Sequence, residues 1–227
     1  MYIEALEDGM TVSFTKNATS GSLYYSLDKQ EWNELTEEMP AINSGEKIYF
    51  KGDLVPASNN GIGTFVINKQ CNVAGNIISL LFADEFIGQT DLTGKDYAFY
   101  RLFRNCTIIQ SAKNLMLHAT TLARSCYRDM FYGCTSFTTA PELPATKMVS
   151  ECYYGMFQDC TSLTSTPELP ATTLANNCYN SMFQGCTGLT IVPELPATTL
   201  AQYCYNNMFR GCTSLISTPE LPATSLA

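Results

Sequence analysis

The second half of this 227-residue chain contains a unit of 26 residues that is written four times. Two cysteines mark every copy, and the spacing between copies has no insertion or deletion. The marker positions are Cys126, Cys152, Cys178 and Cys204, and then Cys134, Cys160, Cys186 and Cys212. A fixed period of roughly 20–50 residues is typical of proteins in which each unit buries its apolar face against its neighbours. The repeat therefore predicts a solenoid.

Within a unit, apolar residues recur at steps of four. One copy has Leu174, Cys178, Met182 and Cys186 at these steps. Positions four apart share one face of an α-helix, so this segment predicts an amphipathic helix. The segment from 189 to 196 carries two prolines, which allow only a very short strand. We therefore expect each unit to consist of a helix, a tight turn, a short extended segment and a loop.

Residues 1–70 do not repeat, and they contain short β-branched and aromatic segments separated by turn residues. The expected strands lie within residues 11–14, 23–27, 47–50 and 64–67. Strands at this spacing predict a small antiparallel β-sandwich of the Ig-like type. The stretch Tyr25-Ser26-Leu27-Asp28 followed by Trp32 resembles a hairpin of bacterial Ig-like modules. Trp32 is interpreted as a packing aromatic, with a sugar-stacking role as the alternative.

The predicted organisation has three parts and an α+β fold class. Residues 1–70 form the β-sandwich, residues 71–121 a cap and a degenerate repeat, and residues 122–227 the 26-residue repeats. Residues 76–82 are expected to be the first strand of the solenoid. The segment 222–227 opens a fifth copy that stops before its helix, so we expect the chain to be part of a longer protein.

Composition excludes several partners. The net charge is −8 with no Lys/Arg-rich run, which argues against nucleic acid and against an anionic membrane surface. No segment reaches the ~18 apolar residues that a membrane span needs. The N-terminus lacks the features of a signal peptide, which leaves a cytosolic protein or a trimmed chain as readings, and trimming is favoured.

The ten cysteines are expected to be packing residues. Two cysteines eight residues apart on a helix are separated by about 12 Å, too far for a disulfide. A free cysteine behaves as a small hydrophobe, so we predict buried thiols. In the second column, Cys160 and Cys186 lead toward strands expected to be only ~4.8 Å apart, which leaves disulfides between units as the alternative there. No metal site and no cofactor are expected, because no C-x-x-C occurs and His118 is the only histidine.

The motif M-F-x-G-C-T-S-L-T followed by P-E-L-P-A-T-T-L-A resembles the BspA-type leucine-rich repeats of bacterial surface proteins. An aromatic, a cysteine and a leucine at three-residue steps carry the resemblance, as in Phe183, Cys186 and Leu189, and Phe137 departs from the leucine. The resemblance covers about residues 97–227. It implies a curved right-handed solenoid on host-associated bacteria, with roles in adhesion and protein binding and no shared catalytic residues. The P-E-L-P insertion and a longer helix depart from the family.

Three sets of repeated positions are candidate binding surfaces. The glutamates of P-E-L-P form one column, which could hold cations such as calcium, attract a basic partner or be a solvated edge. A tyrosine follows the first cysteine of every unit, and we interpret this column as packing between units rather than as a platform for a ligand. Polar positions on the expected outward helix face vary between units. They are either a recognition surface or a solvated face whose sequence has drifted. The candidate ligand-facing residues are Glu142, Glu168, Glu194, Glu220, Tyr154, Asn180, Tyr203 and Asn206.

The function favoured by the sequence is a non-enzymatic binding or adhesion module, at the cell surface or secreted. Its partner would be an extracellular protein or glycan. The alternative is a structural stalk of a longer surface protein, and a glycan-processing enzyme is the least favoured hypothesis because no catalytic motif is present. The apolar end of the last unit also predicts an end-to-end homodimer.

Overall fold

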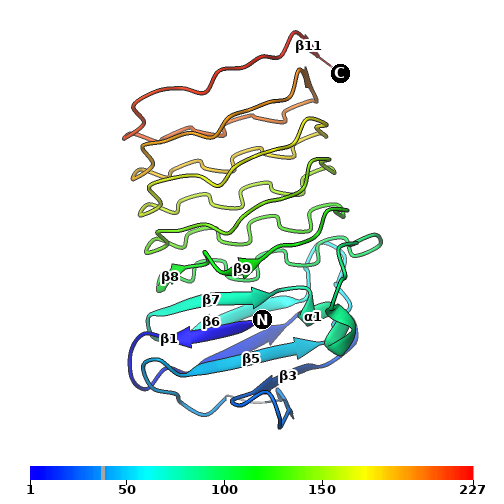
Figure 1. Ribbon diagram of the computed structural model, residues 1–227, viewed down its shortest axis with the longest axis vertical. Helices are drawn as coiled ribbons and strands as arrows, with labels where there is room; N and C mark the ends of the chain where they lie inside the picture. Colours follow the sequence, from blue (N-terminus) through cyan, green and yellow to red (C-terminus); the bar gives the residue numbers. More distant parts are fainter. Residues whose placement is uncertain (37–38, 227) are drawn as a thin grey trace.

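The computed structural model describes residues 1–36 and 39–226. Figure 1 shows short strands at the N-terminal end and, above them, a stack of flattened coils that continues to the C-terminus. Each coil is one repeat unit, and equivalent residues of successive units lie above one another. Among the described residues, no helix is long and apolar enough to cross a membrane.

The N-terminal part contains two sheets that share one core. The larger sheet has the strand order β4-β3-β5-β1-β7-β8, with β9 also paired to β7. Its strands are β1 (Tyr2–Ala5), β3 (Leu23–Ser26), β4 (Asn33–Glu34), β5 (Lys47–Gly52), β7 (Cys71–Asn76), β8 (Ile109–Ser111) and β9 (Leu115–Met116). The smaller sheet pairs β2 (Val12–Lys16) with β6 (Gly63–Ile67). Alternation along β1 and β5 sends Ile3, Ile48 and Phe50 inward, where Phe50 meets Phe65 of β6 at 4.9 Å between ring centroids.

The predicted strands of residues 1–70 are present, but the antiparallel Ig-like sandwich is a wrong description of this part. The larger sheet is mixed, because β7 pairs in parallel with β8 and β9. Through these strands the sheet continues into the repeat region. The strand expected at residues 76–82 is also wrong, because β7 ends at Asn76. Asn76 accepts a hydrogen bond from the Ile78 N–H at 3.0 Å, and the chain turns there into α1 (Ser79–Phe82) and the 3₁₀ turn η1 (Ala83–Phe86).

The predicted α+β class with a leucine-rich repeat solenoid of helix and strand units is wrong. Within the described residues, α1 is the only α-helix, and it has four residues. The stretches expected to be helices are chains of tight turns, which we call the turn segments. They comprise residues 123–134, 149–160, 175–186 and 201–212.

The hydrogen bonds of the turn segments explain why no helix forms. Alternate amides bond within the unit, as when Met130 N–H donates to the Tyr127 carbonyl at 3.3 Å. The amides between them donate to the next unit, as when Phe131 N–H donates to the Met156 carbonyl at 2.9 Å. Equivalent aromatic rings of successive full units are consequently 5.6–5.9 Å apart. Packed α-helices need about 8–10 Å, so helices do not fit at this spacing.

The backbone of the turn segments enters the left-handed region at every fourth residue. In the first full unit these residues are Ser125, Asp129 and Gly133, with φ of 53°, 53° and 70°. The equivalent residues in the other units are Tyr97, Arg101, Asn105, Glu151, Gly155, Asp159, Asn177, Ser181, Gly185, Tyr203, Asn207 and Gly211. Gly, Asn and Asp tolerate this conformation best, and they hold most of these positions. The backbone conformation of a turn segment therefore repeats every four residues.

The opposite side of each unit is extended but forms almost no ladder. It pairs with its neighbour through isolated parallel bridges, such as Lys147 with Thr173 and Ser165 with Ile191. On this side of the described units, only β10 (Thr199–Leu200) and β11 (Ser225–Leu226) form a two-residue pair. The prolines of P-E-L-P lack the N–H that a ladder needs. On this side of the stack, neighbouring units are therefore not joined by a continuous ladder, and hollows lie between them.

Candidate functional site

The four P-E-L-P segments lie one above another, and we call them the P-E-L-P row (residues 141–144, 167–170, 193–196 and 219–222). Extended backbone alternates its side chains, so the glutamate of each segment is exposed while the next leucine is buried in the first three. Leu143, Leu169 and Leu195 are 4%, 3% and 4% exposed. They anchor the row to the core. The structure therefore does bring Glu142, Glu168, Glu194 and Glu220 into one column on the surface.

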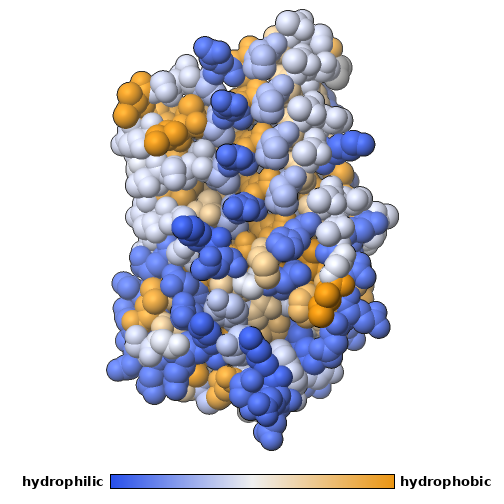
Figure 2. All heavy atoms as spheres, viewed as in Figure 1, coloured by the Kyte–Doolittle hydropathy of each residue, from blue (hydrophilic) through white to orange (hydrophobic). Residues whose placement is uncertain are grey.

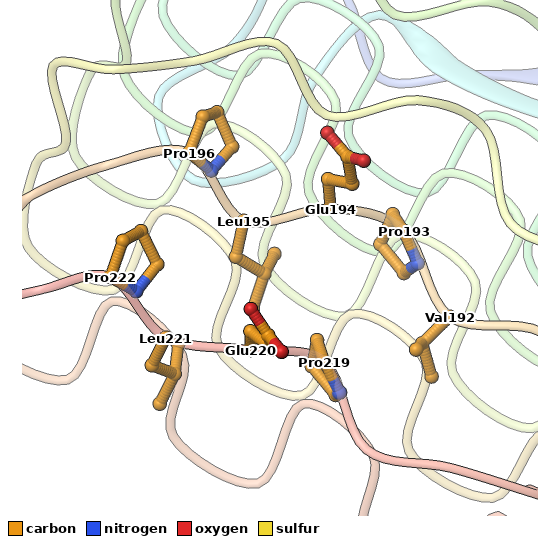
Figure 3. Close-up of a pocket in the computed structure, with 9 residues that line it drawn as sticks. All are labelled: Val192, Pro193, Glu194, Leu195, Pro196, Pro219, Glu220, Leu221 and Pro222. Carbon is orange, nitrogen blue, oxygen red and sulfur yellow. The ribbon is translucent and has the colours of Figure 1, made fainter.

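Grooves separate neighbouring segments of the row. One of about 470 Å³ lies between residues 192–196 and 219–222. Figure 3 shows the two segments side by side, with Glu194 and Glu220 between the proline rings of each. A second groove of about 380 Å³ lies between residues 140–144 and 167–170. Figure 2 shows the consequence of this repetition, with rows of hydrophilic and hydrophobic side chains along the stack. Each groove thus has apolar proline walls and acidic groups.

The electrostatics of the row favour a cationic ligand. Among the ion pairs of residues 1–36 and 39–226, none involves the four glutamates of the row. Stacked like charges without counter-charges raise the local negative potential. The calcium alternative has no geometric support, because no group of three His, Cys, Asp or Glu side chains in the described part of the chain is placed to hold a metal ion.

The row changes character at its N-terminal end. A hollow of about 610 Å³ there uses Glu142 and Pro144 on one side and the loop around Lys113 and His118 on the other. Two basic residue types therefore face the first acidic segment. A cationic ligand would meet its best environment between Glu168 and Glu220, away from this end.

The variable polar positions do not form one continuous exposed surface. Tyr154 is half-buried, with the Arg128 guanidinium 4.4 Å from its ring centroid. Asn180 is 9% exposed, and its amide donates to Asn177 at 3.0 Å. Tyr203 is 57% exposed, and Asn206 is also exposed. The first two side chains therefore serve contacts within the protein, and the last two lie on the final turn segment.

An arginine-carboxylate network on the turn segments was not predicted from the sequence. Glu151 pairs with Arg124 at 3.4 Å and with Arg128 of the same preceding unit. Asp129 lies 3.5 Å from Arg101 of the unit before, and burial raises the pKa of its carboxyl. These pairs cross between units. Opposite charges 27–28 residues apart are the signal that could have revealed them.

The tyrosine column packs in the core, as the favoured interpretation holds. Tyr127, Tyr153 and Tyr179 are at most 1% exposed, and their rings are stacked. The hydroxyls of Tyr127 and Tyr153 have no hydrogen-bond partner among the described residues. Burial raises the pKa of both phenols well above the usual value. This column is therefore not an accessible binding platform.

The prediction of buried, unpaired cysteines is confirmed for nine of the ten, and Cys212 is free but partly exposed. Each thiol of the second column donates to a carbonyl of the preceding unit, as Cys160 does to Phe131 at 3.1 Å. Burial raises the pKa of Cys126 to about 12. A thiol of this kind stays protonated at neutral pH and is a poor nucleophile.

Comparison with models of protein families, with curated proteins and with solved structures finds no match. The resemblance of the repeats to BspA-type units thus rests on the motif residues alone. The grooves and charges of the P-E-L-P row remain the basis for a functional proposal.

Proposed function

We propose that this chain is a non-enzymatic binding module, displayed on a cell surface or secreted, and that the P-E-L-P row is its ligand-facing side. The ligand we propose is a basic segment of an extracellular protein. The observation that carries the proposal is the column of exposed glutamates without ion-pair partners in the described structure, set in grooves with proline walls.

The chemistry of the grooves matches lysine and arginine side chains. Their long alkyl stems can pack on the proline rings while their charged ends reach the carboxylates. The net charge of −8 adds long-range attraction for a basic partner. The motif resemblance to BspA-type surface proteins, which are linked to adhesion and protein binding, supports the same class of function. The high thiol pKa argues against cysteine catalysis.

A labelled decalysine peptide is a simple probe, with decaglutamate as the negative control. The test variant is Glu168→Gln with Glu194→Gln, and the matched control is Glu31→Gln with Glu85→Gln. Both double variants change the net charge equally at exposed positions. We expect decalysine binding to fall about fivefold or more in the first variant and to weaken with salt.

Equal weakening in both variants would mean that the net charge alone attracts the probe, and the row would then have no special role. Unfolding curves for both variants belong beside the binding data. The row variant should be at least as stable as the parent, because the substitutions relieve repulsion between stacked like charges. A loss of fold could then not be mistaken for a loss of binding.

A structural stalk is the second candidate function. The observation that favours it is the continuous set of backbone bonds between turn segments, which makes every unit depend on its neighbours. A stalk requires no affinity for any probe. If substitutions in the P-E-L-P row changed neither cell binding nor peptide binding, the stalk would be favoured.

A further inference from the structure

A second candidate site lies on the N-terminal sheets, apart from the P-E-L-P row. The outward side chains of β1 and β5 include Tyr2 and Tyr49, which are directly paired across the two strands. Their ring centroids are 5.6 Å apart. Together with Trp32 from the loop before β4, these rings line a hollow of about 310 Å³. Small-molecule sites are typically hollows of this size lined by aromatic rings and a few polar groups.

Lysines accompany each of the aromatic rings. The Lys29 amine lies 4.5 Å from the Tyr49 ring centroid, and the Lys51 amine lies 4.4 Å from that of Trp32. Both lysines line the hollow. Lys51 is paired with Asp84 at 2.8 Å, whereas Lys29 is exposed and has no carboxylate partner among the described residues.

Two further groups can serve hydroxyls. Asp84 is an acceptor whose side chain is 79% exposed. Asn76 also lines the hollow, and its side-chain oxygen accepts from the Ile78 N–H, which leaves its amide nitrogen as a donor. The hollow therefore combines aromatic rings flanked by lysine amines, a hydroxyl acceptor, a hydroxyl donor and an ammonium group that has no carboxylate partner in the described part of the chain.

From these contacts we infer that the hollow binds an acidic saccharide, a pyranose that carries a carboxylate. The C–H face of the sugar would pack on Trp32 and the tyrosine pair, and the carboxylate would pair with Lys29. Asp84 and Asn76 would bond the ring hydroxyls. This site is separate from the P-E-L-P row, and it does not depend on the function proposed for that row.

Trp32 is the only tryptophan of the chain, so its fluorescence reports on this hollow alone. The probe is tetragalacturonate, and its methyl-esterified form is the matched neutral ligand. We expect a saturable change in fluorescence with the acid and a weaker response to the ester. Lys29→Gln should weaken acid binding about fivefold, while Lys69→Gln, an exposed lysine outside the hollow, should leave it unchanged.

Three outcomes would overturn the inference. The first is the absence of any fluorescence change at millimolar acid. The second is equal affinity for the acid and its ester, which would remove the role of the carboxylate. The third is equal weakening in Lys29→Gln and Lys69→Gln, which would place the binding elsewhere. Both substitutions are on exposed side chains, so neither readout depends on a damaged core.

Discussion

Replacing Tyr153 by phenylalanine is expected to stabilise the protein. Tyr153 is 1% exposed, and its hydroxyl has no partner in the described structure. A buried polar group without a hydrogen bond costs about 1–3 kcal/mol. The ring itself lies between Tyr127 at 5.6 Å and Tyr179 at 5.9 Å, and those contacts remain in the variant. The same column already contains Phe99, stacked 5.4 Å from Tyr127.

The expected gain in unfolding free energy is about 1 kcal/mol, because loss of the oxygen also removes some packing. For a chain of this size that corresponds to a rise in melting temperature of about 2–4 °C. Urea unfolding followed by circular dichroism measures the change. Tyr205→Phe is the matched control, because Tyr205 is only partly buried and its ring stacks in the same column.

A second readout is the behaviour in alkali. Burial raises the pKa of Tyr153, so the unfolded chain loses this proton near pH 10 while the folded chain holds it. The parent therefore loses stability above pH 10, and the variant should lose less. A Tyr153→Phe protein that is less stable than the parent at neutral pH would show that the hydroxyl makes a favourable interaction, and the reasoning would fail.

The other predictions concern the turn segments, the thiols and the last unit. In urea titrations, Gly185→Ala should lower the free energy of unfolding by about 1–3 kcal/mol more than Gly211→Ala. Both glycines have positive φ, but only the Cβ added at Gly185 would overlap a carboxylate oxygen of the preceding unit. Tyr203→Gly should stabilise by about 1 kcal/mol, since φ of 56° strains an exposed tyrosine, whereas Gln202→Gly should not; equal effects would contradict the strain. The buried thiols should make the free energy of unfolding fall between pH 9 and about 12. In the unfolded chain the Cys126 thiol ionises near pH 9, whereas in the folded protein it stays protonated up to about pH 12. A stability that does not change with pH in that range would contradict the burial of the thiols. The 227-residue chain should associate through the apolar end of its last unit, and light scattering should detect less association when one further repeat is added.

The residues that point inward could be predicted from the sequence. Cys178, Met182 and Cys186 are all fully buried, as the apolar steps of four indicated. The error lay in assigning those steps to an α-helix. An α-helix turns about 100° per residue, so four residues overshoot one turn by about 40°. Over the 12 residues from Leu174 to Cys186 the stripe would drift by about 120°, whereas a turn segment whose conformation repeats every four residues keeps these side chains on one side.

A second signal was present at the left-handed positions. Asn177, Ser181 and Gly185 are also four apart, and each is a residue type that competes with helix formation or tolerates positive φ. Glu151, Arg101 and Tyr203 obscure this pattern, because their types give no reason to expect φ above zero. Bonds between units decide their conformation, and such bonds are not visible within one copy of the sequence.

The candidate sites were partly foreseeable for similar reasons. The glutamate column follows from the period alone, because equivalent residues of stacked units must align. The hollow beside Trp32 does not, since it is assembled from β1, β5, β7, α1, η1 and the loop before β4, which are separated in the chain. The sequence does not show that Tyr2, Tyr49 and Lys29 lie beside Trp32. The sugar-stacking alternative for Trp32 gains a chemical basis only from these positions.

The amides of the turn segments that donate to the next unit have a mechanical consequence. They point from one unit to the next, so a pull along the stack loads these hydrogen bonds along their own length. Under tension the outermost unit should peel away first, and each unit of 26 residues would release about 90 Å of chain. A tether built in this way would lengthen in equal steps, absorbing a sudden load while the units beneath stay folded.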